Sequence, residues 1–160
     1  MASLSPYDRD LNLWIGAQVE ALRAARFADI DLPNVIEELD ALAKRERRAL
    51  QSQLRRAFLH MLKMRYQPEK RTHSWEDSIG KAMQKVFDIL DTSPSLRREM
   101  LDLALKAYPG ARSGAARETR LPLETFSGSI PPDFQSIALT LADVTTDDGL
   151  DALIRLVNRR

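Results

Sequence analysis

The segment Pro33–Gln67, PNVIEELDALAKRERRALQSQLRRAFLHMLKMRYQ, contains no glycine and no proline after its first residue. Asp31 followed by Pro33 is typical of a helix start, because an N-cap side chain accepts backbone N–H groups and proline fits the first turn. Pro68 biases the residue before it away from helical angles and should end the segment. We therefore predict one helix of about 33 residues, or about 50 Å at 1.5 Å per residue.

The rest of the chain predicts further helices and no sheet. Ser5 and Asp8 form a capping box for a first helix, and Ser74 is an N-cap candidate for another. Pro109 and Gly110 should break or kink a helix, which resumes after them. The additional helices that we expect lie at Pro6–Arg26, 75–91, 94–108, 111–120, Asp133–Ala142 and Asp148–Asn158. The predicted class is all-α, an elongated helical bundle with the other helices packed along one long central helix.

The apolar residues of the long helix share one arc of a helical wheel, which predicts its buried face. That face comprises Val35, Ile36, Leu39, Leu42, Ala43, Leu50, Leu54, Ala57, Met61 and Met64. Glu46, Gln53 and His60 lie within the same arc, seven residues apart. Because buried polar groups need partners, either a facing helix satisfies them or they line a groove that is not closed. We interpret them as a polar seam that fixes the register of packing.

Composition places the chain among ordinary globular proteins. It has 160 residues, 44% of them hydrophobic and 29% charged, which is enough for one compact domain with a sizeable core. There is no cysteine, which fits a reducing compartment. No segment follows the pattern of a standard export signal or reaches the roughly 20 apolar residues of a membrane span. We predict a cytoplasmic protein without a membrane segment.

The charge of the chain is unevenly distributed. Residues 1–43 carry eight acidic and three basic side chains, whereas residues 44–71 carry two acidic and ten basic ones. The basic stripe of the long helix comprises Lys44, Arg45, Arg48, Arg55, Arg56 and Lys63. It is either a solvated face balanced by the acidic N-terminal segment or a surface that binds phosphate groups. The net charge of only +1 favours the solvated face, because nucleic-acid-binding domains usually carry a larger excess.

The end of the long helix carries the candidate binding residues, in the stretch HMLKMRYQPEKRTHSW. These are His60, Lys63, Tyr66, Arg71, His73 and Trp75. The two histidines do not form an HxxxH or HExxH pattern, and no cysteine can join them, so we predict no metal and no cofactor. GxSxG, GxxxxGK[ST] and GxGxxG are also missing, so no catalytic residue is assigned.

Several segments together resemble the bacterial domain-of-unknown-function 29 family. They are IEELDAL, HMLKMRYQP, the Arg71 to Trp75 segment, SPSLR and ARETRLPLETF, and they cover about Tyr7 to Phe126. The resemblance implies a small all-helical cytoplasmic protein of bacteria and supplies no activity, cofactor or site residue. It divides the chain into a bundle domain at 1–126 and a helical extension at 127–160, which packs on the bundle or on a partner.

Three hypotheses about function follow. The first is a module without enzymatic activity that binds another protein or itself, because the chain has an amphipathic C-terminal extension and no catalytic constellation. The alternative is a nucleic-acid or phosphate-binding protein that uses the basic stripe with Arg65 and Arg71. The third is a metal-assisted enzyme that uses His60, His73 and nearby carboxylates. The residues favour a protein that is not an enzyme.

Overall fold

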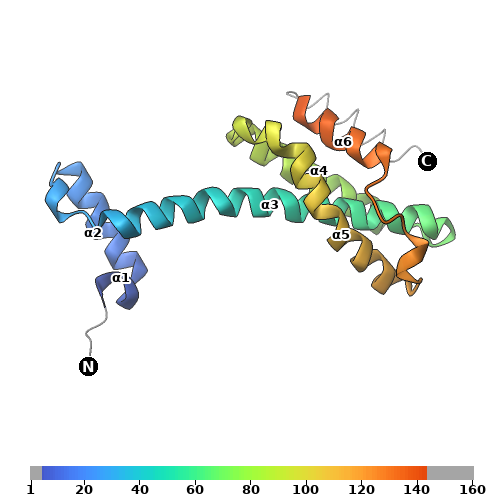
Figure 1. Cartoon of the computed structure of the whole chain (residues 1–160), viewed down its shortest axis with the longest axis horizontal. Helices are drawn as coiled ribbons and strands as arrows, with labels where there is room; N and C mark the ends of the chain where they lie inside the picture. Colours follow the sequence, from blue (N-terminus) through green and yellow to red (C-terminus); the bar gives the residue numbers. More distant parts are fainter. Residues whose placement is uncertain (1–4, 144–160) are drawn as a thin grey trace. The chain divides into compact units, whose positions relative to one another are not determined.

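The computed structural model describes residues 5–143, and this part of the chain consists of helices joined by short turns, without a strand (Figure 1). The predicted all-α class is therefore confirmed. The α-helices are α1 (Pro6–Arg9), α2 (Leu11–Arg23), α3 (Leu32–Tyr66), α4 (His73–Thr92), α5 (Met100–Thr119) and α6 (Pro132–Asp143). The chain forms two compact units, an N-terminal unit of Met1–Arg45 and a C-terminal unit of Glu46–Arg160.

The N-terminal unit holds α1, α2 and the first turns of α3. Ser5 caps α1 as predicted, because its Oγ accepts the backbone N–H of Asp8 at 3.2 Å. The single helix expected at Pro6–Arg26 is wrong in one respect. Asp10 adopts an extended backbone and accepts the N–H of Leu13 as a second N-cap, so the segment forms two helices.

Polar contacts join α1 and α2 to the start of α3. The hydroxyl of Tyr7 donates to Oε1 of Glu38 at 2.7 Å, and Nε1 of Trp14 donates to Oδ2 of Asp31 at 3.2 Å. The bond to Glu38, with burial and the nearby carboxylates, raises the pKa of Tyr7 to about 12. The unit buries little besides these contacts, because only Trp14, Gln18 and Ala21 of its helices are buried.

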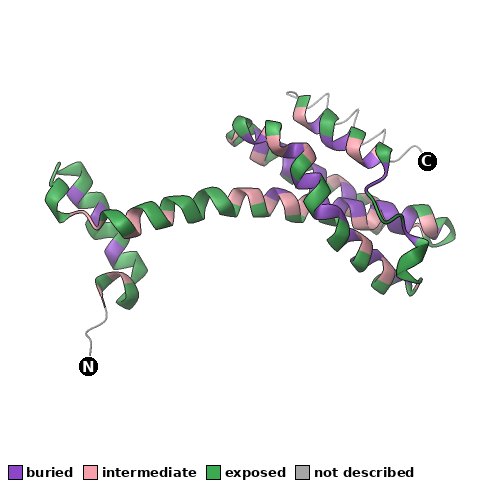
Figure 2. Ribbon diagram, in the orientation of Figure 1, coloured by how far each residue is buried: buried purple, intermediate pink, exposed green. Residues whose placement is uncertain are grey.

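The long helix α3 is confirmed, and it spans 35 residues. Its predicted buried face holds only for the second half. Leu50, Leu54, Ala57, Met61 and Met64 are buried. The prediction is wrong for the first turns, where Val35 is only half-buried and the other members of the face, Ile36, Leu39, Leu42 and Ala43, are exposed (Figure 2). Among residues 5–45, no side chain covers this part of the apolar stripe enough to bury it.

The C-terminal unit contains the hydrophobic core. The helices α4, α5 and α6 gather around the second half of α3 (Figure 1), and their apolar residues form one continuous cluster. Aromatic side chains link the layers: Phe58 of α3 stacks on Phe134 of α6 with ring centroids 5.0 Å apart. The described part of the segment 127–160 belongs to this core through Ile130, Phe134 and Leu141, while the helix predicted at Asp148–Asn158 lies outside the described residues. The division at Phe126 stays a prediction.

Two other sequence predictions need correction in this unit. The helix α5 is continuous and has Pro109 in its interior, instead of breaking there. Leu105 and Pro109 are both exposed, so water can solvate the Leu105 carbonyl that lacks a partner N–H. Ser74 is not a cap, because α4 begins at His73 and its N-cap position is Thr72, with extended backbone.

Candidate functional site

Lys63 lies at a buried junction of three helices rather than on an exposed basic surface. Its Nζ donates to Oε2 of Glu118 on α5 at 2.7 Å and lies 4.4 Å from the ring centroid of Trp75 on α4. The residue is only 8% exposed. The prediction that Lys63 lies on a solvated face is therefore wrong, because its side chain is buried and contacts α4 and α5. A role for Lys63 or Trp75 in ligand binding stays a prediction.

Of the other candidate residues, Tyr66 has its own contact, whereas Arg71 and His73 meet at one carboxylate, that of Glu76. The ring of Tyr66 packs edge-on against Phe126 at 4.7 Å between centroids. Nε of Arg71 donates to Oε1 of Glu76 at 2.5 Å, and this bond holds the pKa of that carboxyl below its usual value. The side chain of His73 is 99% exposed. The structure therefore brings Lys63 to Trp75, and Arg71 to His73 through Glu76, while only His60 of the six lines the pocket described below.

The polar seam of α3 is only partly satisfied. Glu46 accepts a hydrogen bond from the hydroxyl of Ser93 at 2.7 Å, as the interpretation of a satisfied seam requires. In contrast, Oε1 of Gln53 and Nδ1 of His60 are buried without a hydrogen-bond partner among the described residues. Burial lowers the pKa of His60, and the charges of Lys63 and Arg56 lower it further. His60 is therefore held as the neutral imidazole near neutral pH.

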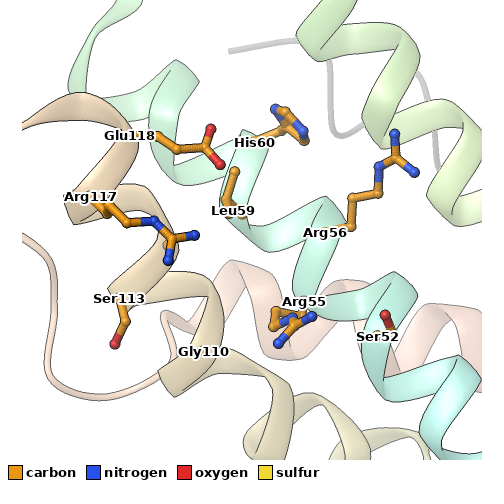
Figure 3. Close-up of a pocket in the computed structure, with 10 residues that line it drawn as sticks. Ser52, Arg55, Arg56, Leu59, His60, Gly110, Ser113, Arg117 and Glu118 are labelled. Atoms are coloured by element: carbon orange, nitrogen blue, oxygen red, sulfur yellow. The ribbon is translucent and has the colours of Figure 1, made fainter.

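His60 lines a pocket of about 480 Å³ between α3 and α5. Figure 3 shows Arg117 reaching from α5 towards α3 and Arg55 lying against the α5 backbone beside Gly110, whereas Arg56 points away from these two. The complete lining consists of Ser52, Arg55, Arg56, Leu59, His60, Gly110, Ser113, Gly114, Arg117 and Glu118. We call this site the arginine pocket.

Two glycines of α5 allow the helices to approach closely at the arginine pocket. A Cβ atom added at Gly110 would lie 2.8 Å from Cδ of Arg55, and one added at Gly114 would lie 2.6 Å from Cδ1 of Leu59. Both distances are shorter than a normal contact, so any larger residue would displace its neighbour. Sequence reasoning missed the α5 half of the pocket. The signal was the pair of small residues four positions apart in the stretch YPGARSGAARETR, which places both on one helix face.

The basic stripe is divided in the structure. Lys44 and Arg45 belong to the N-terminal unit, Arg48 is exposed on the C-terminal unit, and Arg55 and Arg56 line the arginine pocket. No described group of three or more histidine and carboxylate side chains is placed to hold a metal ion. None of the helices in the described range is long and apolar enough to cross a membrane. The cytoplasmic location stays a prediction.

A second surface stands out in the N-terminal unit. Ten of the thirteen large hydrophobic side chains that are exposed in the described chain lie within its 45 residues. We call these ten residues the apolar surface: Leu11, Leu13, Ile15, Val19, Leu22, Phe27, Leu32, Ile36, Leu39 and Leu42. On α2, the positions of Leu11, Ile15, Val19 and Leu22 share one side of the helix, next to the side that buries Trp14.

Comparison with known proteins gives a family and no relative of known activity. No curated protein and no solved structure matches the chain. The family "Domain of unknown function DUF29" matches residues 6–140, which include all six described α-helices except the last residues of α6. A match over this share of the chain shows that the protein belongs to the DUF29 family.

Proposed function

We propose that this protein is a self-association module, in which the N-terminal unit pairs with the same unit of a second copy. The observation that carries the proposal is the apolar surface. Between residues 5 and 45 this unit buries only two apolar side chains, Trp14 and Ala21, so the described part of it lacks the core that a domain of its size needs. A matching surface on a partner would supply the missing core.

The sequence of charges along α3 supports a second copy as that partner. Its first turns carry the acids Glu37 and Asp40, and the later turns of the same unit carry Lys44 and Arg45. Neither of these basic side chains makes an ion pair within residues 5–143. When two copies of α3 pair antiparallel, the acidic turns of each face the basic turns of the other.

The apolar positions fit the same arrangement. Leu32, Ile36 and Leu39 repeat every three or four residues, which forms a stripe that a second helix can cover. If Leu39 of one copy lies opposite Leu42 of the other, the two-fold axis passes between residues 40 and 41, and every contact occurs twice. A parallel pair would instead bring Glu37 and Asp40 close to their own copies, where like charges repel.

Charge reversal tests the orientation as well as the association. We expect Glu37→Lys with Asp40→Lys to weaken the dimer, Lys44→Glu with Arg45→Glu to weaken it similarly, and the four changes together to restore it. Lys81→Glu with Lys85→Glu on α4 is the matched control, since both residues are exposed and lie in the C-terminal unit. Dissociation constants come from sedimentation velocity over a range of concentrations.

The possible results separate the alternatives. A chain that stays monomeric up to ~100 µM would refute the proposal, because a surface that buries this many leucines should associate at that concentration. It would mean that something other than a second copy covers the apolar surface. A dimer whose stability does not respond to either pair of reversals would refute the antiparallel arrangement.

A further inference from the structure

The arginine pocket has the charge of an anion site and lies within the C-terminal unit, whereas the proposed dimer surface belongs to the N-terminal unit. Arg55, Arg56 and Arg117 make no hydrogen bond and no ion pair in the described part of the chain. This separates them from Arg47, which forms two bonds of 2.8 Å to Glu99. Guanidinium groups that line one concave site without forming an ion pair leave a local excess of positive charge.

The single acid in the lining does not remove this excess. Oε2 of Glu118 accepts a hydrogen bond from Nζ of Lys63 at 2.7 Å, so the charge of this carboxylate is already balanced by a buried lysine. His60 adds no charge near neutral pH, because burial favours its neutral form. The lining therefore keeps an excess of positive charge, which Arg55 and Arg117 carry between the two helices.

We propose that the arginine pocket binds the phosphate group of a phosphorylated small molecule, with Arg55 and Arg117 as the two guanidinium ligands. A phosphate monoester has three strong acceptor oxygens and nearly two negative charges at neutral pH. Arginine binds such a group with two parallel N–H···O bonds. A carboxylate can accept the same two bonds, but it carries only one negative charge and would neutralise less of the positive charge of the pocket. The hydroxyls of Ser52 and Ser113, which line the pocket from α3 and α5, add two further donors.

The size and the walls of the pocket favour a small ester. Its volume of about 480 Å³ lies in the usual range for small-molecule sites and leaves room for more than a phosphate group. The lining contains only one large apolar side chain, Leu59, so a hydrophobic ligand would find little to contact. Gly110 keeps the α5 backbone close to the Arg55 side chain, which restricts where that guanidinium can lie.

The distribution of the other basic residues argues against a nucleic acid. A polyanion needs a continuous run of available cations. Three other basic residues of α3 are already paired: Lys63 with Glu118, Arg47 with Glu99, and Arg65 with Asp133. Arg48 is exposed and makes no ion pair in the described part of the chain, but it does not line the pocket. The available cations of α3 in this unit therefore gather at the pocket and do not form a long continuous track.

Calorimetric titration of the full chain at ~50 mM salt tests the proposal, with inorganic phosphate, adenosine monophosphate, adenosine and a single-stranded oligonucleotide as probes. We expect adenosine monophosphate to bind, phosphate to bind more weakly, and adenosine not to bind. Arg55→Gln with Arg117→Gln should weaken binding by about tenfold or more, since each removes charge-assisted hydrogen bonds. Lys81→Gln with Lys85→Gln on α4 removes the same charge outside the pocket and should change the affinity by less than about twofold.

The histidines provide an independent readout in the same protein. A bound phosphate should raise the pKa of His60, which lines the pocket, and leave that of the exposed His73 unchanged. An Arg117→Lys variant keeps the positive charge but cannot form the two parallel N–H···O bonds of a guanidinium, so it should bind with intermediate affinity. Circular dichroism confirms that each variant is folded, which is expected because both arginines are exposed.

Four results would overturn the proposal. They are the absence of binding by either phosphate probe, equal weakening in the pocket variant and the α4 control, an oligonucleotide that binds more tightly than the monophosphate, and a His60 pKa that does not respond. If inorganic phosphate binds as tightly as adenosine monophosphate, the proposal of an ester ligand is wrong and inorganic phosphate is the ligand. None of these results bears on self-association through the N-terminal unit.

Discussion

The substitution Leu39→Gln tests whether Leu39, which is exposed in the single chain, becomes buried in a dimer. Leu39 is 62% exposed in the single chain. Complete burial of a leucine side chain contributes about 1.5–3 kcal/mol, so covering the exposed part contributes about 1–2 kcal/mol in each copy. The two-fold axis doubles this to about 2–4 kcal/mol for the dimer. At 1.4 kcal/mol per factor of ten, the dissociation constant should rise about 30- to 700-fold.

The matched control is Leu139→Gln, because Leu139 is 49% exposed on α6 of the C-terminal unit. Sedimentation velocity gives the dissociation constant of both variants, and urea unfolding gives the stability of each. As exposed positions, both should change the free energy of unfolding of the monomer by no more than about 0.5 kcal/mol. If Leu39→Gln and Leu139→Gln dimerise as well as the unchanged chain, Leu39 is not part of an interface and the reasoning fails.

The remaining predictions concern stability, and urea unfolding measures each of them. Gly80→Ala should stabilise α4 by about 0.5–1 kcal/mol, since nothing lies within 4 Å of the added Cβ, whereas Gly114→Ala should destabilise the protein because its Cβ meets Leu59. Glu118→Gln should lower the free energy of unfolding more than Lys63→Met does, because it leaves a buried ammonium without its carboxylate. The reverse order would contradict a structural ion pair. Hydrogen bonds from Asn34 and Trp14 lower the pKa of Asp31 below its ordinary value of 3.8. The ionised carboxylate therefore stabilises the folded protein above about pH 3.8, and this stabilisation is lost as the pH falls through the folded-state pKa. Asp31→Asn should therefore destabilise the protein at pH 7, and the difference should shrink in acid; a constant difference would exclude this linkage.

The helices were predictable because they depend on local signals. The absence of glycine and proline between Pro33 and Pro68 predicts α3 to within one or two residues at each end. The cap at Ser5 was also evident, because an N-cap and its partner lie within four residues of each other. The second cap at Asp10 has the same chemistry, but a continuous apolar pattern across α1 and α2 hid the interruption.

The surfaces were harder to predict because they depend on what lies opposite. The apolar positions of α3 follow one pattern from Ile36 to Met64, yet helices α4 to α6 cover only its second half. Similarly, a helical wheel places Lys63 beside the apolar face, with the other basic residues. Its side chain is buried because Glu118 and Trp75 approach it from two other helices. The arginine pocket depends on α5, whose glycines alone did not reveal which helix they face.

Distances between spin labels on two copies of the N-terminal unit show directly whether these units pair and in which orientation. The chain has no cysteine, so single cysteines introduced at Pro33 and, separately, at the exposed Ala41 carry one spin label per copy. With the two-fold axis between residues 40 and 41, the labels at 41 are offset along the helix by about 2 Å, and those at 33 by about 22 Å, at 1.5 Å per residue. We expect a dipolar signal from both positions, with the longer distance at 33. Equal distances at the two positions, or no signal between copies, would contradict this expectation.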